Sequence, residues 1–141
     1  MKIYLIEGER GSGKTELASY EYAKVKKNVA FFCHSSSRKY VIGKLKNKYG
    51  IEDPTVLSLS STAPCGYNFK TAIIDELFRF KDKIEGFMTA LLPCFSTNKN
   101  CKIFIYYTIN TIEEEIRLKE FKEKFKYYKI KKIKIFNQDK N

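Results

Sequence analysis

The sequence has few of the residues that build metal centres and disulfide frameworks. It contains one histidine and four cysteines in 141 residues, and no two cysteines have the C-x-x-C spacing of a metal or redox motif. One zinc site can be drawn from Cys33, His34, Cys94 and Cys101, but the sequence disfavours it because paired ligand spacing is missing. We expect the cysteines to be free thiols in a reducing compartment.

Long apolar runs are also absent. No segment approaches the roughly 20 consecutive apolar residues that a membrane-spanning helix requires. The N-terminus runs directly into a strand-like segment with no signal sequence, and no internal repeat is visible. We therefore expect a protein of the cytoplasm, or of the host cytoplasm if it is viral, with no membrane partner.

The composition predicts one compact domain spanning residues 1–141. Hydrophobic residues make up 43% of the chain, which is ample for a packed core, and the length fits a single domain. Lys and Arg total 27 against 16 Asp and Glu. From residue 117 onward the chain has ten basic residues and only three acidic ones. Such a charge attracts a polyanion, most obviously nucleic acid, although a lysine-rich surface without a partner has the same composition.

The most informative stretch is residues 8–15, GERGSGKT, which fits the phosphate-binding pattern G-x-x-x-x-G-K-[ST] at every fixed position. Residues 2–6 before it are apolar and β-prone, and residues 16–27 after it are helix formers without glycine or proline. This strand, loop and helix predict a site for ATP and Mg²⁺. The predicted nucleotide-binding residues are Gly8, Glu9, Arg10, Gly11, Ser12, Gly13, Lys14 and Thr15.

The constrained positions of this loop have physical reasons. Backbone N–H groups can wrap a phosphate only where no Cβ blocks the approach, or where φ is positive, which favours glycine. We expect Lys14 to be a solvent-facing ligand of the β- and γ-phosphates. We expect Thr15 to offer its hydroxyl to Mg²⁺ at a helix N-terminus, which itself attracts anions.

A second motif is the apolar segment 69–74 followed by Asp75 and Glu76, which has the form of a Walker B element. A buried parallel strand places its last residues at the carboxyl edge of the sheet, beside the phosphate loop. There Asp75 would bind Mg²⁺ and Glu76 would orient or deprotonate the attacking water. Adjacent acids also begin many helices, so this motif alone is less specific than the loop.

The rest of the chain alternates between segments with the hydrophobic pattern of strands and segments with that of helices. Further strands are predicted at 28–33, 55–59, 101–107 and 129–136, helices at 34–50, 77–92 and 110–127, and a loop at 60–68. The order predicts a three-layer α/β fold with a mainly parallel central sheet of about five strands. Thr108 and Asn110 follow a strand and would either sense the γ-phosphate or cap the next helix, for which Thr111 is also a candidate cap. On the last, edge strand, Lys129, Lys131 and Lys134 are candidate nucleic-acid contacts.

Residues 8–15 and 73–76 together resemble P-loop NTPases that carry a catalytic glutamate, a group that includes RecA-like ATPases, helicases and viral DNA-packaging motors. The core RGSGKT at 10–15 is similar to the ATPase domain of terminase large subunits. This resemblance implies ATP hydrolysis in work on DNA, with catalytic roles for Lys14, Glu76 and Arg10, the last reading the γ-phosphate. It also implies a homo-oligomer or partner protein that supplies an arginine. The remaining arginines of this chain are Arg38, Arg79 and Arg117.

Two alternatives remain open. Residues 11–17 and 74–76 also resemble thymidine kinases of the RecA-like type, although those kinases hold a zinc-bound lasso with paired cysteines, which this chain lacks. A nucleotide-switched loader or interaction protein would need the same loop. The three hypotheses share ATP and Mg²⁺ and differ in the second substrate or partner.

Overall fold

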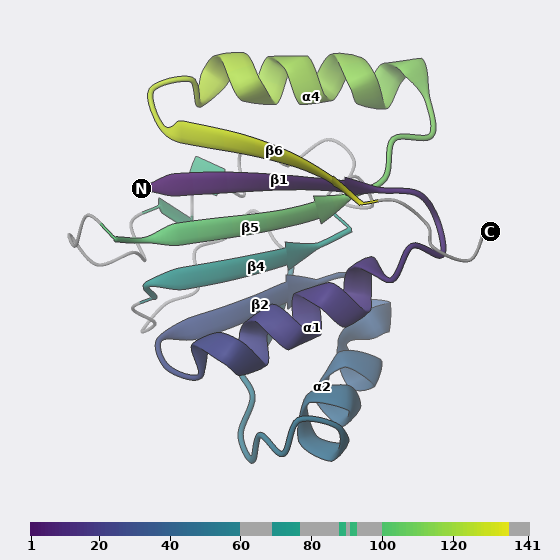
Figure 1. Cartoon of the computed structure of the whole chain (residues 1–141), viewed down its shortest axis with the longest axis vertical. Helices are drawn as coiled ribbons and strands as arrows, with labels where there is room; N and C mark the ends of the chain where they lie inside the picture. The colour runs from purple at the N-terminus through teal and green to yellow at the C-terminus, as the bar shows by residue number, and fades with distance from the viewer. Residues whose placement is uncertain (60–68, 77–87, 90, 93–99, 136–141) are drawn as a thin grey trace.

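The computed structural model describes residues 1–59, 69–76, 88–89, 91–92 and 100–135. These residues form one six-stranded sheet of order β3-β2-β4-β5-β1-β6, and every neighbouring pair is parallel (Figure 1). The α/β fold with a parallel sheet is therefore confirmed, with six strands where about five were expected. The strands are β1 (Lys2–Gly8), β2 (Val29–Cys33), β3 (Val56–Ser58), β4 (Thr71–Asp75), β5 (Lys102–Tyr107) and β6 (Lys129–Ile135).

Helices cover both faces of this sheet. They are α1 (Lys14–Val25), the short 3₁₀ helix η1 (Ser35–Ser37), α2 (Arg38–Asn47) and α4 (Ile112–Lys124). On one face, Leu118 of α4 packs in the same core cluster as Ile3 of β1. On the other face, Ala18 of α1 and Leu45 of α2 share a cluster with Ile6 of β1. Because strand residues alternate between faces, β1 contributes to both clusters and the fold has three layers.

The ends of the helices follow their sequence signals closely. Gly50, at φ 66°, donates its N–H to the Lys46 carbonyl at 3.1 Å and closes α2 as expected. The Thr111 hydroxyl accepts the Glu114 N–H at 3.1 Å and caps α4. In the serine run, the capping group is His34, whose Nδ1 accepts the Ser36 N–H at 3.2 Å. The three serines form η1, and Ser37, the N-cap residue of α2, makes no side-chain capping hydrogen bond.

Several predictions fall partly or wholly outside the described residues. They concern the loop at 60–68, most of the helix at 77–92, Arg79, Cys94 and the last residue of the strand predicted at 129–136. Within the described part, Cys33 and Cys101 are buried thiols that belong to core clusters on opposite faces of the sheet. They therefore cannot ligate one metal. No helix in this part of the chain is long and apolar enough to cross a membrane.

The strand order decides where the candidate site lies. β5 lies between β1 and β4, and all three strands run in the same direction. Their carboxyl ends are level, since Tyr107 of β5 pairs with Glu7 of β1 and the preceding Tyr106 pairs with Asp75 of β4. The segments that follow these strands therefore meet at one edge of the sheet, which is where parallel α/β proteins place their ligands.

Candidate functional site

The loop between β1 and α1 needs its three glycines for two different reasons. Gly11 and Gly13 have φ values of 80° and 83°, in the left-handed region that other residues rarely adopt. Gly8 has an ordinary φ, but a Cβ there would lie 2.4 Å from Ser12 Oγ. The loop is closed by the Ser12 N–H, which donates to the Glu9 carbonyl at 3.1 Å. The geometry of the loop therefore favours glycine at all three positions.

Lys14 lies inside this loop and not in solvent as the sequence predicted. The residue is only 5% exposed, and its Nζ donates to the Glu9 carbonyl at 3.0 Å. This hydrogen bond to the backbone of its own loop keeps the side chain out of solvent, which accounts for the difference. The ammonium is held where the loop opens at the first turn of α1, and the cap residue Gly13 offers that turn no side-chain acceptor. The Lys14 ammonium and the backbone N–H groups at the N-terminus of α1 therefore lie close together, and both attract anions.

Thr15 and Asp75 meet although 60 residues separate them. The Thr15 hydroxyl donates to Asp75 Oδ2 at 2.8 Å. Asp75 is 3% exposed, and its Oδ1 is buried without a hydrogen-bond partner in the described structure. Burial raises the pKa of Asp75 from its usual 3.8 to about 6, and the charge of Glu76 adds to the rise. The hydrogen bond from Thr15 and the charge of Lys14 act in the opposite direction.

This pair suits a small divalent cation. A hydroxyl and a carboxylate within hydrogen-bond distance are hard oxygen ligands, and the unpartnered Oδ1 of Asp75 is the kind of atom that such a cation satisfies. Among the described residues, no group of three or more His, Cys, Asp or Glu side chains could hold a metal by itself. A cation here would complete its shell with water and phosphate oxygens, as Mg²⁺ does in phosphate sites. The residues therefore fit Mg²⁺.

Glu76, directly after β4, has a φ of 60°. This is the left-handed region, where a residue with a side chain is uncommon and somewhat strained. Asp75 lies inward and is buried, whereas Glu76 is half-buried and lines the pocket at the sheet edge. The two adjacent carboxylates therefore have separate environments. Asp75 is buried beside Thr15, where it could hold a cation, and Glu76 lines the pocket.

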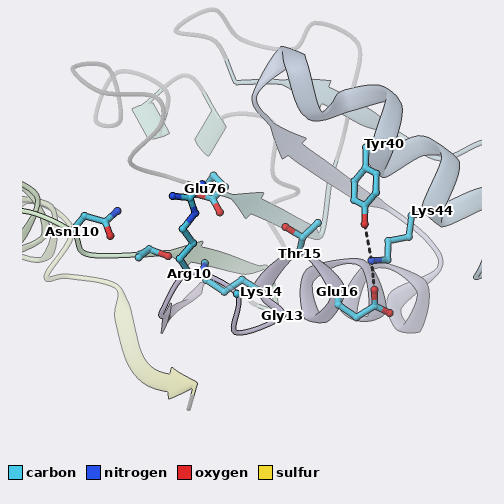
Figure 2. Close-up of a pocket in the computed structure, with 11 residues that line it drawn as sticks. Arg10, Gly13, Lys14, Thr15, Glu16, Tyr40, Lys44, Glu76 and Asn110 are labelled. Atoms are coloured by element: carbon cyan, nitrogen blue, oxygen red, sulfur yellow. Dashed lines mark hydrogen bonds and ion pairs between the residues drawn. The ribbon is translucent and has the colours of Figure 1, made fainter. Parts of the chain in front are cut away.

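A pocket of about 760 Å³ opens at this edge (Figure 2). It brings together the glycine loop, the start of α1, the end of β4, the segment after β5 and part of α2. Its lining residues are Arg10, Gly11, Gly13, Lys14, Thr15, Glu16, Tyr40, Lys44, Glu76, Thr108 and Asn110. Most of the residues predicted to bind a nucleotide or sense its phosphate thus line one pocket. Gly8, Glu9, Ser12 and Asp75 are not among the lining residues and lie next to them.

Two residues of the segment after β5, Thr108 and Asn110, line the pocket, and their contacts differ. Thr108 donates its hydroxyl to the Gly8 carbonyl at 2.8 Å and so holds the loop. Asn110 lies at the end of the pocket opposite Tyr40 (Figure 2). The side-chain cap of α4 is Thr111, so the alternative that Thr108 or Asn110 caps this helix does not hold. Thr108 is a positioning residue, and Asn110 is the better placed of the two to meet a ligand.

The sequence reasoning missed the α2 side of the pocket. Helical spacing predicts Tyr40 on the apolar face of its helix, but Tyr40 is 62% exposed and lines the pocket with Lys44. Lys44 and Lys48 both form ion pairs with Glu16, and the Tyr49 hydroxyl donates to Glu16 at 2.8 Å. A hydrogen bond from Lys44, and a smaller contribution from the one with Lys48, lower the pKa of Glu16 to about 2. No spacing in the sequence joins these residues, because the contact depends on how α1 packs beside α2.

The three lysines predicted to contact nucleic acid do not share one surface. Lys129 and Lys131 are exposed on the face of the sheet that also carries α1. Lys134 belongs to the other face, lies 3.8 Å from Glu7, and lines a smaller pocket of about 290 Å³ together with Arg10. Lys134 is therefore a neighbour of the glycine loop and not distant from it.

Lys129 belongs to a row of lysines at the amino ends of three adjacent strands. In the register of the sheet, Lys129 pairs with Lys2, and Lys2 pairs with Lys102. A pocket of about 410 Å³ is lined by Lys2 and Lys102. In the next row, Lys131 pairs with Tyr4, whose ring stacks on that of its neighbour on β5, Phe104, at 4.8 Å between centroids. No described helix covers β1 and β6 on this face (Figure 1).

The candidate arginines differ in how firmly this chain holds them. Arg10 lines both the large pocket and the adjacent smaller one. Arg38 donates from Nε to the Val56 carbonyl at 2.8 Å and ties α2 to β3. Arg117 lies 3.6 Å from Glu113 on α4. Arg10 is therefore the arginine that the described structure brings to the site.

Comparisons of the chain with protein-family models and with curated proteins found no match. The resemblance carried by residues 8–15 and 73–76 therefore stays a hypothesis, and the geometry of the site carries the functional proposal.

The buried charge of Asp75 gives a prediction about stability. Because its folded pKa lies above the unfolded value of 3.8, Asp75 stabilises the fold below that value and loses this contribution as pH rises through about 6. Asp75→Asn keeps an oxygen for Thr15 but carries no charge. It should therefore raise the free energy of unfolding of the ligand-free protein by about 1–3 kcal/mol at pH 8, and by less at pH 5.

Urea unfolding of both proteins at pH 5 and pH 8 measures this difference. Asp53→Asn, at an exposed carboxylate, is the control for loss of a charge. An Asp75→Asn advantage that does not grow with pH would show that the carboxylate is not desolvated.

Proposed function

We propose that this protein binds ATP with Mg²⁺ and hydrolyses it in work on nucleic acid, as a packaging, translocating or helicase-like ATPase. The observation that carries the proposal is the contact between the Thr15 hydroxyl and the buried Asp75 carboxylate, in front of a glycine loop that opens into α1. A hydroxyl, a carboxylate with an unpartnered oxygen, a lysine and a helix N-terminus converge there. This combination suits a metal-bound polyphosphate better than any uncharged ligand.

In the proposed binding step, phosphate oxygens take the place of the Glu9 carbonyl as acceptors for Lys14. The exchange is favourable because the ammonium attracts a negatively charged phosphate oxygen more strongly than a neutral carbonyl. Backbone N–H groups around Gly11 and Gly13 contribute further donors. Mg²⁺, held by Thr15 and Asp75, would neutralise part of the phosphate charge when it is bound.

In the proposed hydrolytic step, Glu76 accepts a proton from the water that attacks the terminal phosphorus, and the bond between that phosphorus and the bridging oxygen breaks, which releases ADP and inorganic phosphate. Its side chain lines the same pocket as Lys14 and Thr15, and the Thr15 hydroxyl is bound to Asp75 and not to Glu76. Arg10 extends from the loop into this pocket and can stabilise charge on the terminal phosphate (Figure 2). Among the described residues, Arg10 is the only arginine that lines the pocket, and Arg38 is bound to its own β3. Another copy or a partner protein is therefore a candidate source of a second arginine.

The proposed polymer surface is the lysine row at the amino ends of β1, β5 and β6, together with the stacked Tyr4 and Phe104. Regularly spaced lysines track a phosphate backbone, and aromatic rings beside them accept unstacked bases. This combination favours single-stranded nucleic acid over a small-molecule substrate. It supports the ATPase over the kinase, for which a basic surface remote from the pocket has no purpose.

The binding step predicts the effect of removing Lys14. Lys14→Ala should weaken the binding of a fluorescent ATP analogue by roughly 10- to 100-fold, because a charge-assisted hydrogen bond is worth about 1.5–3 kcal/mol. Lys24→Ala, at an exposed lysine of the last turn of α1, is the matched control. Circular dichroism checks that both variants fold, because Lys14 is buried. Unchanged affinity in a folded Lys14→Ala protein would remove the nucleotide from the proposal.

The hydrolytic step predicts that binding and chemistry separate at Glu76. Glu76→Gln keeps the shape of the side chain but cannot take a proton, so the variant should bind ATP normally and hydrolyse it about 10²–10⁴-fold more slowly. Phosphate release under single-turnover conditions measures this rate, with Glu120→Gln on the exposed side of α4 as control. Hydrolysis at the native rate would assign the general base to another residue.

The polymer surface predicts a change in salt dependence. Replacing Lys129 and Lys131 by Gln should reduce the slope of log K against log salt by about 1.5, since each phosphate contact contributes roughly 0.7–0.9. Fluorescence anisotropy with single-stranded DNA and RNA across a salt series measures this slope. The control replaces Lys39 and Lys46, both exposed on α2, by Gln. Lys134 is left intact because it lines a pocket beside the loop.

Both double variants remove two positive charges. Equal salt slopes in the two would therefore mean that binding depends on the net charge of the protein and not on the lysine row. If the native protein neither binds nucleic acid near physiological salt nor changes its ATPase rate with it, the nucleoside kinase and the nucleotide-switched loader become the better hypotheses. Phosphate transfer from ATP to added nucleosides then separates those two.

A further inference from the structure

The pocket is longer than a metal-bound triphosphate requires. Lys14, Thr15 and Glu76 mark the phosphate end, and the sequence motifs account for all three. The opposite wall comes from α2, where Tyr40 and Lys44 line the same cavity of about 760 Å³ (Figure 2). No sequence motif accounts for this wall.

A nucleotide with its phosphates at Thr15 has two directions in which to extend, toward Asn110 or toward Tyr40, which lie at opposite ends of the pocket (Figure 2). The end near Asn110 is polar and adjoins Thr108 and Arg10. Of the eleven described residues that line the pocket, Tyr40 is the only one with an aromatic ring. A nucleobase is a flat ring whose faces are satisfied by stacking on an aromatic side chain.

Tyr40 is held in position relative to the phosphate end. Lys44 Nζ donates to the Tyr40 hydroxyl at 3.4 Å, and the same ammonium forms an ion pair with Glu16. Glu16 directly follows Thr15 in α1, so one short chain of contacts links the tyrosine to the residue next to the proposed metal ligand. Lys44 Nζ also lies over the Tyr40 ring, 5.4 Å from its centroid, and the 62% exposure of Tyr40 leaves further surface for a ligand.

We propose that Tyr40 stacks on the base of the bound nucleotide, and that α2 forms the nucleoside half of the site. This inference rests on the proposed nucleotide function and adds the orientation of the ligand and the residue that holds its base. Stacking does not read the hydrogen-bonding edge of a base, and among the described residues this end of the pocket contributes only Tyr40, Lys44 and the ion-paired Glu16. The site therefore accepts ATP and GTP with similar affinity.

The test compares Mg·ATP, Mg·GTP and inorganic tripolyphosphate, which has no base. Tyr40→Ala should weaken binding of both nucleotides by roughly 5- to 100-fold and leave tripolyphosphate affinity unchanged, since stacking on one base is worth about that factor. Tyr40→Phe should bind like the native protein. Tyr20→Ala is the matched control, because Tyr20 is a similarly exposed tyrosine of α1 that does not line the pocket.

Isothermal titration calorimetry with all four proteins separates the outcomes. If Tyr40→Ala binds ATP as tightly as the native protein, the base lies elsewhere and the inference is wrong. If it loses tripolyphosphate affinity to the same extent, Tyr40 acts only through Lys44 and Glu16 on the phosphate end, and the stacking role is also wrong. If the native protein binds neither tripolyphosphate nor nucleotide, the proposed function itself fails.

Discussion

The contact between Thr15 and Asp75 is the interaction on which the site depends. It joins the first turn of α1 to the last residue of β4, and it forms only because β5 lies between β1 and β4 with their carboxyl ends level. The contact has a cost, because the carboxylate is buried and one of its oxygens has no partner in the described structure. A residue chosen only for stability would not be ionised at this position. The cost is consistent with a group kept for its ligand.

Glu76 carries a cost of the same kind, because it has a positive φ without being glycine. The ammonium of Lys14 is satisfied by a carbonyl of its own loop, which a ligand would have to replace. A bound metal would supply a partner for the buried oxygen of Asp75, and a polyphosphate would replace the carbonyl at Lys14. Part of the free energy of binding would therefore come from the removal of unfavourable interactions in the ligand-free state, and binding would stabilise the folded protein.

Much of the fold and the phosphate end of the site could be predicted from sequence, because those features depend on local patterns. The strand before the glycine loop, the strand that ends at Asp75, the glycine that closes α2 and the threonine that caps α4 are each specified within a few residues. Tyr40 could not be predicted, because its place in the pocket depends on the packing of α2 beside α1. The burial of Lys14 depends on the path of the loop, and the separation of Lys131 from Lys134 depends on which face each residue of β6 presents.

The lysine row and the pocket at the glycine loop lie at opposite ends of the same strands. Lys2 and Lys102 begin β1 and β5, whereas the pocket opens beyond the carboxyl ends of both. A strand of the length of β1, Lys2–Gly8, spans about 20 Å, so a polymer on the row would not touch the phosphates. A close-packed sheet transmits force but deforms little. If the row binds nucleic acid and the pocket hydrolyses ATP, as proposed, the two events would therefore be coupled through movement of the whole domain against a neighbour, which could also supply a second arginine.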